Sequence, residues 1–97
     1  MITELKLRSP DLKSLKQIIQ SALSERLQSL EIGIKRTEER INEFETKYQL
    51  STVEFLRRFN NDELEHCFDF DEWIGESRML EHLQLKKKAI EGVEFVN

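Results

Sequence analysis

The sequence of 97 residues contains one cysteine, one proline and three glycines, and it has no long apolar run. A single cysteine cannot form a disulfide within the chain, so a reducing compartment, the cytoplasm, is the simplest expectation. A bilayer-spanning helix needs about 20 consecutive apolar residues, so no membrane association is expected. The N-terminus also lacks the apolar centre of a signal peptide. Because glycine and proline interrupt helices, their scarcity favours a single all-α domain over residues 1–97.

Charge is unevenly distributed along the chain. The formal net charge is −4, which gives no general reason to expect nucleic-acid binding. The segment from Asp62 to Glu76 holds seven acidic residues and no basic one, so the rest of the chain holds 12 of the 19 acids and all 15 bases. The sequence therefore combines an acidic segment with a mildly basic body.

The N-terminal residues allow two interpretations. Apolar and polar residues alternate over Glu4–Arg8, which predicts a short strand. A lone strand needs a partner edge, so an extended, partly frayed arm over residues 1–9 is the alternative. Next, Ser9, Pro10 and Asp11 predict a helix start, because serine can cap, proline fits the first helical position and an acid complements the helix dipole.

A long helix is predicted over residues 10–49, where Gly33 is the only weak position. Between Leu27 and Tyr48 apolar residues recur at steps of three, four, seven, three and four, which is a heptad pattern. The predicted oligomer seam consists of Leu23, Leu27, Leu30, Ile34 and Ile41.

The length of this helix restricts how it can be covered. At 1.5 Å per residue its stretch from Asp11 to Tyr48 would run about 57 Å, whereas a compact domain of this size has a radius of gyration of about 13 Å. The helix must either break near Gly33 or project and pair with another chain. We favour pairing, most simply in a homodimer, because the heptad seam continues across Gly33, which itself lies off the seam. Packing of the helix on the C-terminal half of its own chain is the alternative.

A short helix is predicted over residues 52–59. Ser51 and Glu54 have the spacing of a capping box, in which each side chain bonds to the other residue's backbone N–H. Leu50 and Phe55 have the spacing of the hydrophobic staple that accompanies such caps.

A return helix is predicted over residues 70–91, capped by Asp69 or Asp71 and antiparallel to the long helix. The expected architecture is a helical hairpin or coiled coil. Its aromatic centre should consist of Phe44, Tyr48, Phe55, Phe59 and Trp73.

The stretch NNDELEHCFDFDEW, residues 60–73, carries six carboxylates, three aromatic rings, a histidine and a cysteine. A zinc site usually draws on two separated ligand pairs, and only one group of ligands is present, so no metal is expected. His66 and Cys67 are adjacent, so on a helix their side chains point about 100° apart. A catalytic cysteine needs the imidazole within hydrogen-bond reach of its sulfur, and this angle does not allow that. The sequence predicts no catalytic residues, no cofactor and no enzyme activity.

Two interpretations of this stretch remain. The aromatic residues can anchor the last helix in the core. Alternatively, aromatic anchors flanked by carboxylates suit recognition of a basic protein, with the rings supplying the desolvated contact and the charges steering approach. The candidate partner-binding residues are Glu65, Phe68, Asp69, Phe70, Asp71, Glu72 and Trp73.

The run from Gly33 to Leu83 resembles a group of small helical proteins of bacteria and archaea. Their pattern is FExKYGMSxEEFxxxFxxGEL followed by DDxDFxEWxxLYE. The matching residues are Phe44, Glu45, Lys47, Tyr48, Ser51, Glu54, Phe55, Phe59, Glu63, Leu64, Asp69, Phe70, Glu72 and Trp73. The chain departs from the pattern at Gln49 and Asn61, where the group has glycine, and at Cys67. The resemblance implies an antitoxin-like partner encoded beside a small toxin gene, without catalytic residues.

Three functions follow as hypotheses. The favoured one is a non-enzymatic interaction module that binds and occludes a small basic toxin. The first alternative is a structural coiled-coil homodimer without such a partner. The second is a DNA-binding regulator in which Lys6 and Arg8, on an N-terminal strand, read the major groove.

Overall fold

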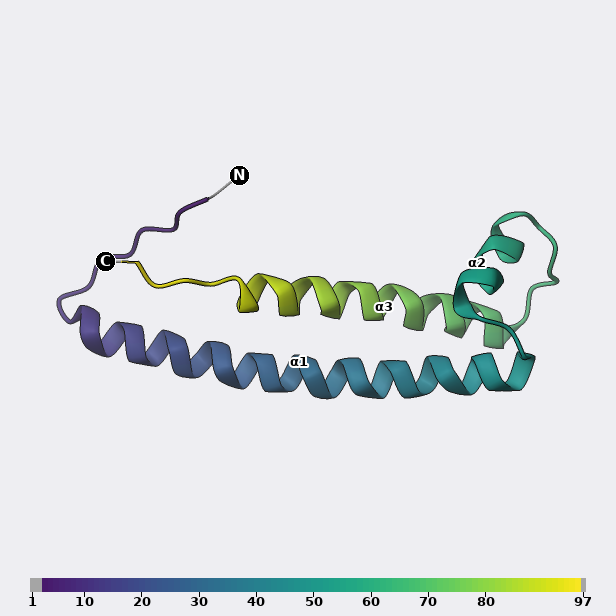
Figure 1. Cartoon of the computed structure of the whole chain (residues 1–97), viewed down its shortest axis with the longest axis horizontal. Coiled ribbons are helices and arrows are strands. Elements are labelled where there is room, and N and C mark those ends of the chain that lie inside the picture. The colour runs from purple at the N-terminus through teal and green to yellow at the C-terminus, as the bar shows by residue number, and fades with distance from the viewer. Residues whose placement is uncertain (1–2, 97) are drawn as a thin grey trace.

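The structure is a computed structural model that describes residues 3–96. It contains three helices, α1 (Leu12–Tyr48), α2 (Thr52–Asn60) and α3 (Phe68–Glu91). No strand occurs in this described part of the chain. Figure 1 shows α1 along the whole molecule, α3 returning beside it, and α2 folded across the end where the two meet. The expected all-α fold is confirmed.

The strand expected over Glu4–Arg8 does not form among the described residues. The physical reason is that no other extended segment pairs with it, and Leu5 is 85% exposed. The arm expected over residues 1–9 begins outside the described residues; its residues 3–9 have no regular secondary structure. Figure 1 places this arm and the tail that follows α3 at the same end of the molecule, opposite α2.

Helix α1 begins one residue after Asp11, which caps it. The Asp11 carboxylate accepts a hydrogen bond from the Ser14 N–H at 3.1 Å, whereas Ser9 only accepts one from the Asp11 N–H. The cap is therefore Asp11 and not Ser9. The helix continues without a break through Gly33, where a Cβ atom would lie 3.4 Å from the Leu83 side chain on α3.

Helix α3 covers the middle and the end of α1. The α1 residues buried there are Leu30, Ile34, Thr37, Ile41 and Phe44. The contact closes within one chain, because α1 and α3 pack together along their shared length. Neither a break at Gly33 nor a second chain is needed to bury these positions.

Helix α1 is longer than its cover, with 37 residues against 24 in α3. Leu83 lies beside Gly33, and the Lys87 ammonium lies 3.9 Å from the Glu31 carboxylate. Since α3 ends at Glu91, the first turns of α1 extend beyond it, and the tail runs alongside them (Figure 1). We call residues 12–25 of α1 the overhang.

The aromatic centre lies at the opposite end, which we call the head. Its buried residues are Phe44, Phe55 and Trp73, and Tyr48 and Phe59 pack against them. The expected aromatic centre is therefore present. The Trp73 indole N–H donates to the Thr52 hydroxyl at 2.9 Å, and this hydroxyl donates to the Glu45 carboxylate at 2.9 Å. This chain of hydrogen bonds joins all three helices.

Candidate functional site

The acidic–aromatic stretch forms the connection between α2 and α3 and the first turns of α3 (Figure 1). Helix α3 begins at Phe68, with Cys67 at the cap position and no side-chain cap bond. The expectation that Asp69 or Asp71 caps the helix is wrong. Both lie inside the first turn, where a carboxylate still faces the positive end of the helix dipole.

Two of the candidate partner-binding residues point into the head. Trp73 has no exposed surface. The Phe70 ring meets Tyr48 edge-on, with centroids 5.1 Å apart, and lies 5.2 Å from Phe55. Phe70 and Trp73 therefore act as the core anchors of α3 in the free chain, which agrees with the core interpretation.

Asp69 is held by two residues at the end of α1. Its carboxylate accepts hydrogen bonds from the Lys47 ammonium and the Tyr48 hydroxyl, both at 2.6 Å. These bonds, that from Lys47 first, lower the pKa of the Asp69 carboxyl from its usual value. In return, the bond to Asp69 raises the pKa of Lys47 and that of Tyr48. Asp69 thus fixes the start of α3 on the last turn of α1.

Glu72 forms a second link between α1 and α3. Its carboxylate lies 2.6 Å from the Arg40 guanidinium, which also binds Glu43 at 2.9 Å. The same guanidinium lies over the Phe44 ring, 4.7 Å from its centroid. All three charged side chains are about half exposed, so the pair contributes little energy and mainly sets register.

The remaining three candidates face solvent. Phe68 is 88% exposed, which is unusual for a large aromatic side chain. Glu65 and Asp71 are exposed, and neither forms an ion pair with any residue in the described range 3–96. We call Glu65, Phe68 and Asp71 the acidic face. The exposed Cys67 lies next to it, whereas the neighbouring His66 ring packs edge-on against Phe59.

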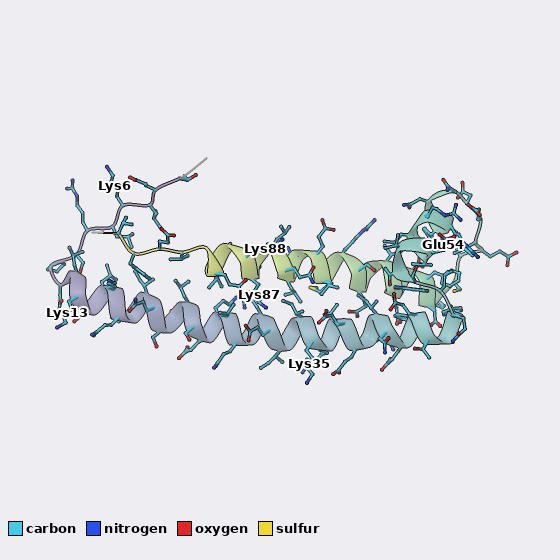
Figure 2. The ribbon with its side chains drawn as sticks, in the orientation of Figure 1. Lys6, Lys13, Lys35, Glu54, Lys87 and Lys88 are labelled. Atoms are coloured by element: carbon cyan, nitrogen blue, oxygen red, sulfur yellow. The ribbon has the colours of Figure 1, made fainter. Side chains whose placement is uncertain are left out.

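Helix α2 carries a charge network that the sequence did not indicate, centred on Glu54, which Figure 2 labels on this helix. The Ser51 hydroxyl accepts a bond from the Glu54 N–H, as expected for a cap. The Glu54 carboxylate does not return to Ser51 but binds Arg57 at 2.7 Å and Arg58 at 3.0 Å, so the capping box is only half formed. These bonds, that from Arg57 first, lower the pKa of Glu54 from 4.5 to about 2.

Sequence reasoning missed the partners that neutralise Asp69 and Glu72. A signal exists in the spacing: Arg40 and Lys47 are seven residues apart, so they share one face of α1. Asp69 and Glu72 are three apart and share one face of α3. Two cations facing two carboxylates at matching spacing predict an interhelical pairing, once the helices are known to be antiparallel.

The predicted oligomer seam divides into two parts. Leu30, Ile34 and Ile41 are buried by α3 within the chain, whereas Leu23 and Leu27 remain partly exposed. Only the N-terminal part of the seam can therefore contact another molecule without displacing α3.

Comparisons with protein-family models, curated proteins and solved structures find no match to this chain. Within residues 3–96, no group of three or more histidine, cysteine or acidic side chains is arranged to hold a metal ion. None of the helices described is both long and apolar enough to cross a bilayer.

Proposed function

We propose that the chain is a non-enzymatic, cytoplasmic interaction module that binds and occludes a small basic protein, as an antitoxin does its toxin. The observation that carries the proposal is the acidic face. Phe68 is 88% exposed on the first turn of α3, Asp71 follows three residues later on the same helix, and Glu65 precedes it by three residues in the connection; neither carboxylate forms an ion pair within residues 3–96. An exposed aromatic ring beside unpaired acids has the composition of a contact for a cationic surface.

The two parts of the face have different roles in this proposal. Burying a phenylalanine side chain contributes about 1.5–3 kcal/mol, so Phe68 supplies affinity. Glu65 and Asp71 steer the basic partner and set its orientation. Occlusion follows because a cationic surface covered by this face cannot reach an anionic substrate.

The head supports such binding by being rigid. Asp69 is tied to Lys47 and Tyr48, and Trp73 stacks between rings from α1 and α2. Phe68 is therefore presented on a turn that is already ordered, and binding does not have to order it, which reduces the entropic cost of association.

Co-expression with the small protein encoded by the neighbouring gene tests the proposal. We expect the two proteins to co-purify and this chain to relieve growth inhibition by the other. Phe68→Ser should weaken the complex at least about tenfold. The matched control is Val53→Ser, which removes another exposed apolar side chain, 81% exposed, from α2. Equal binding by Phe68→Ser and the unmodified chain would contradict the proposal.

The steering charges allow a separate test. The double variant Glu65→Gln, Asp71→Asn should slow association and reduce its dependence on salt. A matched control is Glu38→Gln, Glu39→Gln, which removes two exposed acids from the middle of α1. If both double variants slow association equally, the effect arises from net charge and not from the acidic face.

A structural coiled-coil homodimer is the second candidate function. It is favoured by the overhang of α1, where Leu12 is 59% and Ile18 is 64% exposed. The DNA-binding alternative loses its structural support, because residues 3–9, which include Lys6 and Arg8, form no strand in the described chain.

A further inference from the structure

The overhang carries an apolar stripe that no helix of the described chain covers. The stripe consists of Leu12, Leu15, Ile19 and Leu23. Leu12 is 59% exposed and the other three are partly exposed. The tail runs beside them, and its Phe95 ring contacts Lys16, with the ammonium 5.5 Å from the ring centroid. The tail covers the stripe incompletely, because Leu12 stays 59% exposed beside it.

We propose that a second copy of this chain covers the stripe, with the two overhangs packed antiparallel to each other. This inference specifies the surface of the homodimer, the second candidate function, and does not depend on the acidic face. The stripe continues, through Leu27, the line of α1 side chains that α3 buries from Leu30 onward. The partner's overhang would therefore occupy the position in line with α3, where α3 stops.

The position of α3 determines the direction of the pair. A parallel second α1 on this face would reach Leu30 within a few residues and would have to occupy the space of α3. An antiparallel second α1 begins near the end of α3 and runs away from it. The antiparallel arrangement therefore covers the stripe without displacing a helix, and only the irregular tail, whose Phe95 ring lies 5.5 Å from the Lys16 ammonium, has to shift.

The spacing of the stripe fits this arrangement. In an antiparallel pair Leu12 faces the other copy's Leu23, and Leu15 faces the other copy's Ile19. The stripe has steps of three, four and four residues in one direction and of four, four and three in the other, so the two stripes stay aligned to within one residue. Each overhang thus places an apolar side chain opposite every apolar side chain of the other. The contact is isologous, as a closed twofold dimer requires.

The helix ends that meet in this dimer have complementary charges. The C-terminal end of α3, which is partially negative, faces the N-terminal end of the other copy's α1, which is partially positive. Glu91 is the last residue of α3, so its negative charge is repelled by the negative end of its own helix dipole. Lys13, in the first turn of α1 at the end far from the head (Figure 2), provides the opposite charge from the other copy.

The arrangement has a consequence for the heads. Each head lies at the end of its rod opposite the overhang (Figure 1). The antiparallel dimer therefore presents its two acidic faces at its two far ends, separated by the full length of the pair. Two partner proteins could then bind without touching each other.

Sedimentation of the full chain over a wide concentration range, in reducing buffer, tests whether the dimer exists and uses this surface. We expect a species with twice the mass of one chain. Ile19→Asp should raise the dissociation constant at least about tenfold while helical circular dichroism is retained. The matched control is Ile32→Asp, at an α1 position 62% exposed outside the overhang, which should leave the dimer unchanged.

Cysteine cross-linking tests the direction. Leu15→Cys and Ile19→Cys are made separately in a Cys67→Ser background, since Cys67 is exposed, and the two variants are mixed and oxidised. We expect the mixed disulfide between positions 15 and 19 to predominate.

Three results would overturn the inference. A monomer at every concentration shows that no second copy covers the stripe. A dimer that withstands Ile19→Asp shows that the homodimer exists but forms through another face. Predominant disulfides between two copies of Leu15→Cys show parallel pairing.

Discussion

The indole ring of Trp73 lies flat against the ring of Phe55, with centroids 3.9 Å apart and an interplanar angle of 4°. Both side chains have no exposed surface. Trp73 comes from α3 and Phe55 from α2, and Phe44 of α1 stacks on Trp73 from another side at 5.8 Å. One indole therefore joins three helices, and the stability of the head depends on it more than on any of the surface ion pairs.

We expect Trp73→Ala to lower the free energy of unfolding by about 3–5 kcal/mol, because it leaves a large cavity in the aromatic centre. The control is Phe68→Ala on the same helix. Phe68 is 88% exposed, so this change should stay within about 0.5 kcal/mol of the unmodified chain. Urea unfolding followed by circular dichroism measures both. Similar losses in the two variants would show that Phe68 is packed in solution.

The hydroxyl of Thr52 should contribute to the free energy of unfolding, because it accepts the hydrogen bond of the Trp73 indole N–H. Thr52→Val keeps the shape but leaves the buried Trp73 indole N–H without the acceptor that it has at 2.9 Å. We expect a loss of about 1–3 kcal/mol. Thr52→Ser keeps the hydroxyl and should recover most of this loss. Equal unfolding midpoints for the valine and serine variants would mean that the hydrogen bond to Trp73 is not maintained.

The chain should lose stability in acid because of Glu54 and Asp69. The Arg57 and Arg58 side chains lower the pKa of Glu54 from 4.5 to about 2, and the bonds from Lys47 and Tyr48 lower that of Asp69. A carboxyl whose pKa is lower in the folded state binds fewer protons there than in the unfolded chain. Its stabilisation is complete above the unfolded pKa and is lost as the pH falls through the folded value.

Urea midpoints measured from about pH 6 down to about pH 2 test this dependence. The midpoint should fall below about pH 4.5, and Glu54→Gln and Asp69→Asn should each flatten the decline. Glu81→Gln, which removes an exposed carboxyl that forms no salt bridge with any residue in the range 3–96, is the control. A decline that is unchanged in both test variants would rule out these two carboxyls as its source.

Gln49 ends α1 in the left-handed region, with φ at 51° and ψ at 48°. Glycine adopts this conformation without steric cost, so Gln49→Gly should raise the free energy of unfolding by about 0.5–1 kcal/mol. The glycine expected at Asn61 falls one residue later, because F-x-x-G-E-L counted from Phe59 to Glu63 and Leu64 places it at Asp62, the second left-handed residue, with φ at 56°. Asn61→Gly, where φ is −97°, should therefore give no gain. Thermal melts of the two variants distinguish the positions.

The segments of regular structure were largely accessible from the sequence. The helices observed at Leu12–Tyr48, Thr52–Asn60 and Phe68–Glu91 lie within two residues of the ranges expected from apolar periodicity and turn residues. These are local signals, because the 3.6-residue period and the Ser51 cap act within one or two turns. The aromatic centre could also be predicted, since large rings near two successive turns have few other places to be buried.

The orientation of individual residues in the acidic–aromatic stretch could not be predicted. Phe68 and Phe70 are two residues apart, so on a helix they point in nearly opposite directions. The packing angle of α3 on α1 decided that Phe70 is buried and Phe68 exposed. The same packing paired Asp69 with Lys47 and Glu72 with Arg40, so these acids became interhelical links, whereas Glu65 and Asp71 form no ion pair within residues 3–96.

The sequence by itself determined that this protein is helical, that its charge is segregated, and that α1 has an apolar face longer than a small globule can bury. Only the tertiary structure decided what covers that apolar face. The choice between α3 and another chain depends on contacts between residues far apart in the sequence, such as Gly33 and Leu83, and periodicity within one helix carries no information about such contacts. In the structure α3 covers this apolar face from Leu30 onward, whereas no helix covers it along the overhang in residues 3–96.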